Sequence, residues 1–238
     1  MVLPEDAAPA PGEPLRVLYQ DDVLVAIDKP AGWLVHRSNL DRHETRVVMP
    51  VLRDQLGRHV YPAHRLDKGT SGVLLLALNP EVCAALGRQF QAQQIDKRYW
   101  AVVRGWPPAS GRIDHPLARV VDDYGGTAMA AEPRAALTDY RCLATVELPH
   151  RVDRYPTSRY ALLALAPATG RQHQLRRHLK HIAHPIIGDA TYGKGRHNRL
   201  FQAEYQCHRL LLACVGLGLR HPLTGCLLYT SDAADDTP

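Results

Sequence analysis

The sequence predicts an α+β fold, organised as one large domain or at most two small ones over 238 residues. Short runs that alternate or are continuously apolar, bounded by Gly, Pro or Asp, are typical of strands. They cover residues 16–19, 23–27, 73–78, 97–103, 137–148 and 159–165. Apolar residues recur at helical spacing in residues 46–56, 79–90 and 172–182. Predicted strands therefore outnumber predicted helices.

The N-terminal residues 1–14 are rich in Ala, Pro and acidic side chains, a composition typical of disorder. We therefore expect a disordered tail at 1–14 and a folded domain over residues 15–228. The first two strands are joined at Asp21-Asp22. The second strand ends at the run Lys29-Pro30-Ala31-Gly32, because Pro and Gly interrupt a strand.

The stretch Ala63-His64-Arg65-Leu66-Asp67-Lys68-Gly69-Thr70-Ser71-Gly72 precedes the apolar run 73–78. Its glycines and its Thr-Ser pair predict a tight loop beside a buried strand. A carboxylate next to cations stays ionised, so Asp67 suits a nucleophile or an electrostatic stabiliser better than a general acid. The alternative is a structural loop whose aspartate caps a turn.

The next helix has a strong start at residues 79–81, where Asn caps, Pro occupies the first turn and Glu faces the helix dipole. Tyr99 lies in the alternating strand 97–103, a pattern typical of a half-buried structural aromatic. Residues 107–135 are poorly patterned and predict a long excursion. The strands 137–148 and 159–165 predict a hairpin.

The segment 169–179, Thr-Gly-Arg-Gln-His-Gln-Leu-Arg-Arg-His-Leu, opens a basic helix. Leu175, Leu179 and Ile182 share one face. The opposite face carries His173, Arg176, Arg177, Lys180, His181 and His184. For a generic helix these would form a solvated charged face, whereas beside an active site they can grip phosphates.

The net charge is +5, and acidic residues are concentrated at the two ends of the chain. The more basic body favours a polyanionic partner, with nucleic acid first. The five cysteines form no Cys-x-x-Cys pair and the histidines no His-Glu-x-x-His pattern, so we expect no metal. Without a basic start or a long apolar run, the expected location is the cytoplasm.

Several motifs together resemble the RluA-type pseudouridine synthase family over roughly residues 16–228. They are His-Arg-Leu-Asp at 64–67 followed by Thr-Ser-Gly, Lys-Pro-x-Gly at 29–32, Lys-Arg-Tyr at 97–99, the basic segment 169–178 and Arg-Leu-Leu-Leu-Ala at 209–213. The resemblance implies the pseudouridine synthase fold. That fold is a mixed, largely antiparallel central sheet flanked by helices and loops, with a central active-site cleft. It also implies isomerisation of uridine in RNA without metal or organic cofactor.

The resemblance also implies residue roles. Asp67 matches the catalytic aspartate, Arg176 the arginine that pairs with it through its guanidinium fork, and Tyr99 the tyrosine that contacts the target base. Leu212 matches an active-site leucine, while Ala213 stands where the family has a histidine. The remaining expected RNA- or substrate-binding residues are Lys29, His64, Arg65, Arg171, His173, Arg177 and Lys180.

Stretches outside these motifs resemble a tRNA-modifying branch of the family, whose substrate is a uridine in the T-stem. The most specific is His-Arg-Ser at 36–38 with Asp-Arg-His-Glu-Thr at 41–45; residues 94–99, 154–157 and 174–179 add to it. We therefore expect a monomeric enzyme acting on uridine 65 of tRNA. The alternatives are ribosomal RNA as substrate, a glycosidase-like hydrolase working through Asp67, and an RNA-binding protein without chemistry.

After residues 222–225 the family continues with a strand and a final helix, whereas residues 229–238 here are acidic and unpatterned. We expect 229–238 to be a disordered or non-native tail. A strand and a helix built on this segment would contradict that expectation.

Overall fold

The computed structural model describes residues 13–37, 43–119 and 132–231. Its strands are β1 Val17–Gln20, β2 Leu24–Lys29, β3 Tyr61–Pro62, β4 Ser71–Ala77, β5 Asp96–Arg104, β6 Ser110–Asp114, β7 Leu137–Leu148, β8 Ser158–Pro167, β9 Leu212–Arg220 and β10 Leu227–Ser231. Its helices are α1 Val48–Leu56, α2 Pro80–Gln91, α3 Gln174–His181 and α4 Gly195–Tyr205. In the described part of the chain, none of these helices is long and apolar enough to cross a bilayer.

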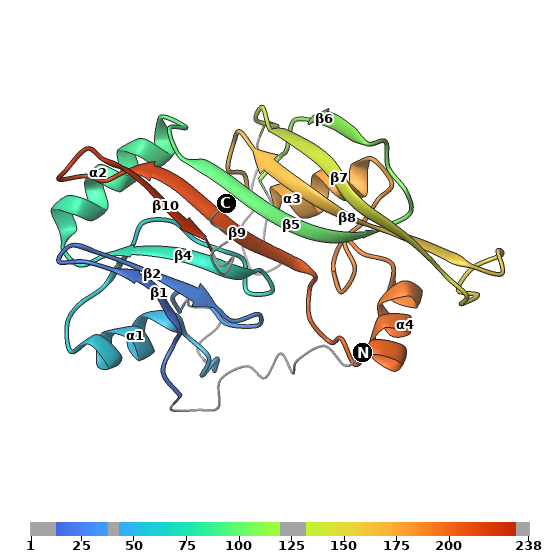
Figure 1. Ribbon diagram of the computed structural model, residues 1–238, viewed down its shortest axis with the longest axis horizontal. Coiled ribbons are helices and arrows are strands. Elements are labelled where there is room, and N and C mark those ends of the chain that lie inside the picture. The colour runs from blue at the N-terminus through green and yellow to red at the C-terminus, as the bar shows by residue number, and fades with distance from the viewer. Residues whose placement is uncertain (1–12, 38–42, 120–131, 232–238) are drawn as a thin grey trace, which may run out of the picture.

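The strands form one ten-stranded sheet in the described residues, with the order β1-β2-β4-β9-β5-β8-β7-β6 (Figure 1). β10 adds to β9, and β3 adds to β4. The β4–β9 pair is parallel, whereas the other strand pairs are antiparallel. The predicted α+β class with a mixed, largely antiparallel sheet is confirmed.

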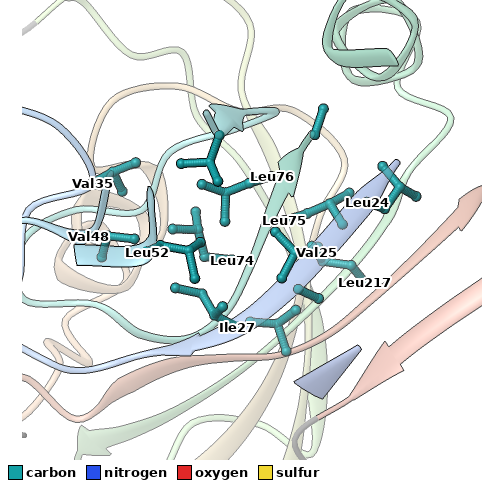
Figure 2. Packing of buried hydrophobic residues seen from close by; sticks show 14 of the residues in the cluster. Leu24, Val25, Ile27, Val35, Val48, Leu52, Leu74, Leu75, Leu76 and Leu217 are labelled. Atoms are coloured by element: carbon teal, nitrogen blue, oxygen red, sulfur yellow. The ribbon is translucent and has the colours of Figure 1, made fainter. Parts of the chain in front are cut away.

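The sheet carries one hydrophobic core in each half. In the first half, β2 and β4 pack against α1, with Leu24, Ile27, Leu74 and Leu52 among the buried side chains (Figure 2). β4 reads as a continuous apolar run because each residue from Val73 to Ala77 is fully buried. In the second half, the apolar face of α3 packs on β5, β8 and β9.

The two halves meet where β4 and β9 run parallel, in a register of only Ser71 with Ala213 and Gly72 with Cys214. Gly72 has a φ of +96°, and a Cβ atom there would lie 2.1 Å from the carbonyl oxygen of Cys214. Only glycine fits so close a backbone approach. The end of the 63–72 loop is therefore fixed against the middle of the sheet.

The strands and helices predicted from periodicity are present, with small differences in their bounds. The Asn79 side chain accepts the Val82 N–H at 2.8 Å, as the predicted cap requires. β6 falls inside the segment predicted as an excursion, because only Ile113 of its five residues is buried and no apolar pattern marks it. α4 is not predicted from the sequence either, since His197 is its only buried residue.

Both chain ends bear on the expected domain bounds. Leu15 is buried and its backbone exchanges two hydrogen bonds with the Gln55 side chain. Residues 1–12 of the predicted N-terminal tail, 120–131 of the excursion and 232–238 lie outside the described residues. The expected boundary at 228 is wrong by three residues, because β10 continues to Ser231 and pairs with β9 along its length.

Candidate active site

Asp67 lies in the loop between β3 and β4, close to the centre of the sheet. Its carbonyl oxygen accepts the Thr70 N–H at 3.0 Å, which closes the predicted tight turn. Its side chain is 25% exposed, so the carboxylate is held in place yet open to a substrate. The structure thus gives Asp67 the constrained position that the sequence predicts.

Arg176 joins Asp67 to a second carboxylate that the sequence analysis does not assign. Its Nη1 donates to Asp67 at 3.4 Å. Its Nε and Nη2 instead form a two-point contact with Asp189, at 2.7 and 2.9 Å. The prediction that the guanidinium fork binds Asp67 is therefore wrong: the fork binds Asp189, and Asp67 receives the remaining, longer bond.

Asp189 is the buried anchor of this group, with a side chain that is 0% exposed. Besides the fork of Arg176, its Oδ1 accepts the N–H groups of Thr191 and Tyr192 at 2.9 and 2.8 Å. Burial alone would raise the pKa of Asp189, but the hydrogen bonds from Arg176 and the two backbone amides outweigh it and lower that pKa. Asp189 is therefore ionised and fixes the direction of Arg176.

The signal for Asp189 in the sequence is weak. Asp189 lies 13 positions after Arg176, beyond the end of the helix. No periodicity predicts that contact.

Tyr99 reaches the same region from β5, where it pairs with Cys214 of β9. Its ring is half-buried and packs against both cores. Burial, the Cys214 thiol and then the charge of Asp67 raise its pKa well above the ordinary value. The phenol is thus neutral. Tyr99 and Gly72 both pair with Cys214 of β9, so Tyr99 lies two strands across the sheet from the end of the loop that carries Asp67.

His173 and Tyr192 complete the surroundings of Asp67. The His173 Nε2 atom lies 3.9 Å from Asp67, and its Nδ1 atom contacts the Tyr192 hydroxyl at 3.0 Å. The Arg176 guanidinium lies over the Tyr192 ring, 5.0 Å from its centroid. Burial lowers the pKa of His173, with Asp67 opposing. His173 is therefore a neutral neighbour of Asp67 at pH 7, not one of the cations of the helix.

Lys29 is enclosed by the protein, which corrects its predicted contact with RNA. The residue is 0% exposed, and its Nζ donates to the carbonyl oxygens of Pro30, Trp33 and Lys68 at 2.9, 2.8 and 3.3 Å. Burial lowers its pKa to about 7, although Asp67 and Asp28 oppose the shift. Lys29 instead ties the Lys-Pro-x-Gly loop to the loop that carries Asp67.

His64 is also structural, although the sequence predicts substrate contact. Its Nε2 accepts the Leu75 N–H at 3.0 Å, and its ring lies 5.0 Å from that of Phe90. Burial lowers its pKa to about 4, so the ring is neutral and accepts that bond. Arg65, next in the chain, is exposed.

The remaining predicted residues divide by exposure. Arg171 and Arg177 donate to the carbonyl oxygens of Ala135 and Ala118 at 3.1 and 2.7 Å, so each also supports backbone on either side of the 120–131 segment. Lys180 is exposed, with its Nζ 5.6 Å from the Tyr192 ring centroid. Leu212 is buried at the start of β9 in the second core.

Within the described ranges, no group of three or more His, Cys, Asp or Glu residues is arranged to hold a metal ion.

The arrangement provides one partly exposed carboxylate, a largely buried guanidinium that bonds to it, and a neutral phenol.

Comparisons with known proteins indicate the family to which the chain is related. The family profile described as RNA pseudouridylate synthase matches residues 23–181. Among solved structures, human RNA Pseudouridylate Synthase Domain Containing 4 superposes with a TM-score of 0.66 and 27% identity, covering 93% of this chain and 89% of that one. Human RNA Pseudouridylate Synthase Domain Containing 1 has the same fold, with a TM-score of 0.73, 24% identity and coverages of 95% and 86%.

Bacterial relatives are more similar in sequence. A protein named tRNA pseudouridine synthase C from Vibrio parahaemolyticus is 47% identical over 94% of this chain and 92% of its own length. Its namesake from Pectobacterium carotovorum subsp. carotovorum is 53% identical over 89% of this chain, and the match spans 57% of that relative. The namesake from Salmonella typhimurium is 50% identical, with coverages of 94% and 86%. The chain therefore belongs to the RNA pseudouridylate synthase family.

Proposed function

We propose that this protein isomerises a uridine of transfer RNA, uridine 65 in the T-stem, to pseudouridine with Asp67 as the catalytic carboxylate. The observation that carries the proposal is the geometry around Asp67: one partly exposed carboxylate, bonded by Arg176, on a loop whose end lies two strands across the sheet from Tyr99. The choice of transfer RNA is supported by the name of relatives that align along nearly all of this chain. A monomeric state and a cytoplasmic location are part of the same proposal.

The isomerisation needs few protein groups. The N1–C1′ glycosidic bond breaks, the uracil turns over, and C5 bonds to C1′ before the C5 proton leaves. Asp67 acts in one of two ways. Its oxygen displaces N1 from C1′ and is itself displaced when C5 bonds to C1′, or it removes the C2′ proton as N1 leaves and returns that proton when C5 bonds to C1′. Both first steps need a carboxylate oxygen that can reach the sugar, and the bond from Arg176 engages Oδ2 of Asp67 rather than both oxygens.

The target base must leave the RNA stem before it can turn over, at a cost of a few kcal/mol. Tyr99 is placed to stack on the extruded uracil, an interaction worth roughly 1–3 kcal/mol per base. Cations near the site offset the rest of the cost of extruding the base by binding phosphates of the RNA. Arg65 and Lys180 are exposed and able to do so.

The arrangement argues against the hydrolase alternative. A retaining glycosidase needs a second working carboxylate about 5 Å from the first. Asp189 is the carboxylate that shares Arg176 with Asp67, but it is 0% exposed and held by the guanidinium fork and two backbone amides. A side chain so enclosed does not reach a substrate.

The test is to map pseudouridine in unmodified tRNA and in ribosomal RNA fragments before and after incubation with the protein. We expect pseudouridine at position 65 of tRNA and none in the ribosomal fragments. Modification of ribosomal RNA alone would replace the substrate assignment. Release of free uracil would replace isomerisation by hydrolysis, and RNA binding without either product would leave a binding protein.

A further inference from the structure

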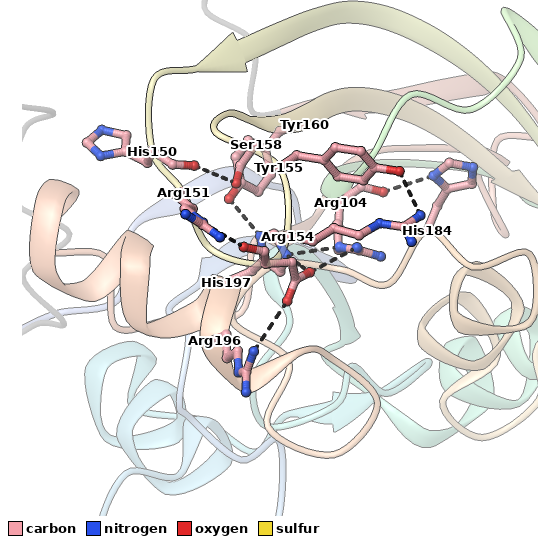
Figure 3. A network of polar contacts seen from close by, with 11 residues as sticks. Arg104, His150, Arg151, Arg154, Tyr155, Ser158, Tyr160, His184, Arg196 and His197 are labelled. Atoms are coloured by element: carbon pink, nitrogen blue, oxygen red, sulfur yellow. Dashed lines mark hydrogen bonds and ion pairs between the residues drawn. The ribbon is translucent and has the colours of Figure 1, made fainter.

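A second polar group lies outside the residues around Asp67, where the β7–β8 hairpin loop meets α4 and the end of β5 (Figure 3). An open pocket of about 390 Å³ is lined there by Arg104, Asp153, Arg154, Tyr155 and Arg196, which we call the arginine pocket. Three arginines face one aspartate, so the lining carries an excess of positive charge. None of the residues assigned to catalysis lines it.

The arginine pocket is pre-organised by its one carboxylate. Asp153 lies 3.2 Å from the Nη2 of Arg104, 3.7 Å from the Nη1 of Arg196 and 3.3 Å from the Nε2 of His197. His197 is itself buried and bonded through Nδ1 to the Tyr160 hydroxyl at 2.8 Å, which anchors the group to β8. Two of the three arginine heads are thus aimed before any ligand arrives.

The lining is also open to solvent. The Arg196 side chain is 71% exposed and Tyr155 is 57% exposed. Arg154 lies over the Tyr155 ring, 4.7 Å from its centroid. Exposed guanidinium groups bind phosphates in two-point geometry, and an aromatic ring beside an arginine is a surface on which an unstacked base can stack. An ion-pair group that served only to anchor the hairpin would need neither the charge excess nor the exposed ring.

The arginine pocket is joined to the catalytic group by a few direct contacts. Asn198, two positions after Arg196 in α4, accepts the Gly188 N–H at 2.9 Å and donates to the carbonyl oxygen of Asp189 at 3.0 Å. The Arg104 N–H donates to the carbonyl oxygen of Pro185 at 3.0 Å. The segment between Pro185 and Asn198 therefore contacts both sites. RNA that delivers a uridine to Asp67 extends over neighbouring surface, because a helical arm is much wider than one nucleotide.

We propose that the arginine pocket is a second contact site for the substrate RNA, binding its phosphate backbone away from the target uridine. Arg104, Arg154 and Arg196 hold phosphate oxygens, and Tyr155 covers the adjoining sugar or base. The inference rests on the proposed function for the identity of the ligand. It also gives a role to the run 154–157, which the sequence analysis singles out without assigning one.

The test compares an Arg154→Ala/Arg196→Ala double variant with an Arg88→Ala control. Arg88 is exposed on α2, at the opposite end of the molecule from α4 in Figure 1. We expect the double variant to weaken tRNA binding by about three- to tenfold for each arginine removed. We also expect the log–log salt dependence of binding to flatten by about 0.7 to 0.9 for each phosphate released. The KM for tRNA should rise by a larger factor than kcat falls.

An Arg154→Lys/Arg196→Lys variant guards against a folding artefact, since it keeps the charge and should recover most of the salt dependence. Direct binding to tRNA is measured without reference to catalysis, so it decides the inference even where no pseudouridine forms. Binding and salt dependence equal to those of Arg88→Ala would overturn it. Absence of pseudouridine with wild-type protein, together with intact pocket-dependent tRNA binding, would overturn the proposed function alone.

Discussion

Asp189 and Asp153 each hold arginines, but they do so in opposite surroundings. The Asp189 side chain is 0% exposed and shares one arginine with Asp67, so two carboxylates meet one guanidinium. The Asp153 side chain is 40% exposed and sits among three arginines. Around Asp189, two carboxylates therefore share one guanidinium. Because the fork of Arg176 is taken by Asp189, Asp67 receives a bond at Oδ2 rather than at both oxygens. The exposed group has surplus positive charge, which is available to a polyanion.

The two groups should differ most in how much stability is lost when one arginine is removed from each. Arg176→Ala leaves Asp189 as an unpaired buried charge, and we expect it to lower the free energy of unfolding by about 3–5 kcal/mol and to abolish most activity. Arg196→Ala should change that free energy by less than about 0.5 kcal/mol, because its side chain is exposed. Urea unfolding followed by circular dichroism measures both. Equal stabilities for the two variants would contradict the comparison.

Gly72→Ala tests whether the catalytic loop depends on the β4–β9 junction. The new Cβ would lie 2.1 Å from the Cys214 carbonyl oxygen, on a backbone with a φ of +96°. We expect a loss of about 2–3 kcal/mol in stability and a fall in activity, because relief of the clash displaces the end of the loop that carries Asp67. Gly87→Ala is the matched control, since a Cβ added there on α2 meets no other atom within 4 Å. A Gly72→Ala protein with wild-type stability would show that the junction is looser than described.

Replacement of each aspartate by asparagine should lower kcat at Asp189 and strengthen tRNA binding at Asp153. Asp189→Asn loosens the two-point hold on Arg176, and we expect kcat to fall by about 10²-fold while tRNA binding changes little. Asp153→Asn keeps a side-chain oxygen that can still accept from Arg104 and so position it, but removes the one negative charge from the arginine pocket, so tRNA binding should tighten by about two- to threefold. Fluorescence anisotropy with labelled tRNA and single-turnover assays measure the two effects. Weaker binding in Asp153→Asn would indicate that Asp153 positions the arginines more than it neutralises them.

The pH dependence of stability gives a smaller and more local test. The pKa of His64 is about 4 in the folded protein because the ring is buried, against an ordinary value of about 6.5 in the unfolded chain. The unfolded state therefore binds more protons between these values, and stability falls as pH decreases through that window, by at most about 1.4 kcal/mol per pH unit from this group. His64→Gln should remove that part of the slope, whereas His208→Gln, at an exposed position, should leave it. Identical slopes in wild type and His64→Gln would show that His64 is not the linked group.

The sequence identifies the reactive residues of the site better than the residues that hold its loops in place. Asp67, Arg176 and Tyr99 stand in motifs, and the structure bonds Arg176 to Asp67 and places Tyr99 two strands across the sheet from the end of the Asp67 loop. Lys29 and His64 also stand in motifs and have polar side chains, but their partners are backbone groups that carry no sequence signal. Whether such a polar side chain contacts substrate or backbone depends on how the surrounding core encloses it. The amino-acid composition does not show that enclosure.

The arginine pocket shows the same limit on a larger scale. The run 154–157 is visible as a motif, whereas Arg104 and Arg196 lie roughly 50 and 40 positions away in β5 and α4. α4 itself has too few buried apolar residues to be recognised by periodicity. A site assembled from a strand end, a hairpin loop and a polar helix can therefore be recognised only after the sheet has brought these elements together.

The central claim is that Asp67 performs the chemistry. Its most direct test is to compare wild type with Asp67→Asn, which keeps the shape of the side chain and removes its charge, by mapping pseudouridine in tRNA and by measuring tRNA affinity on the same preparations. We expect pseudouridine formation to be abolished while affinity stays within about tenfold of wild type. Wild-type levels of pseudouridine from Asp67→Asn would contradict the assignment.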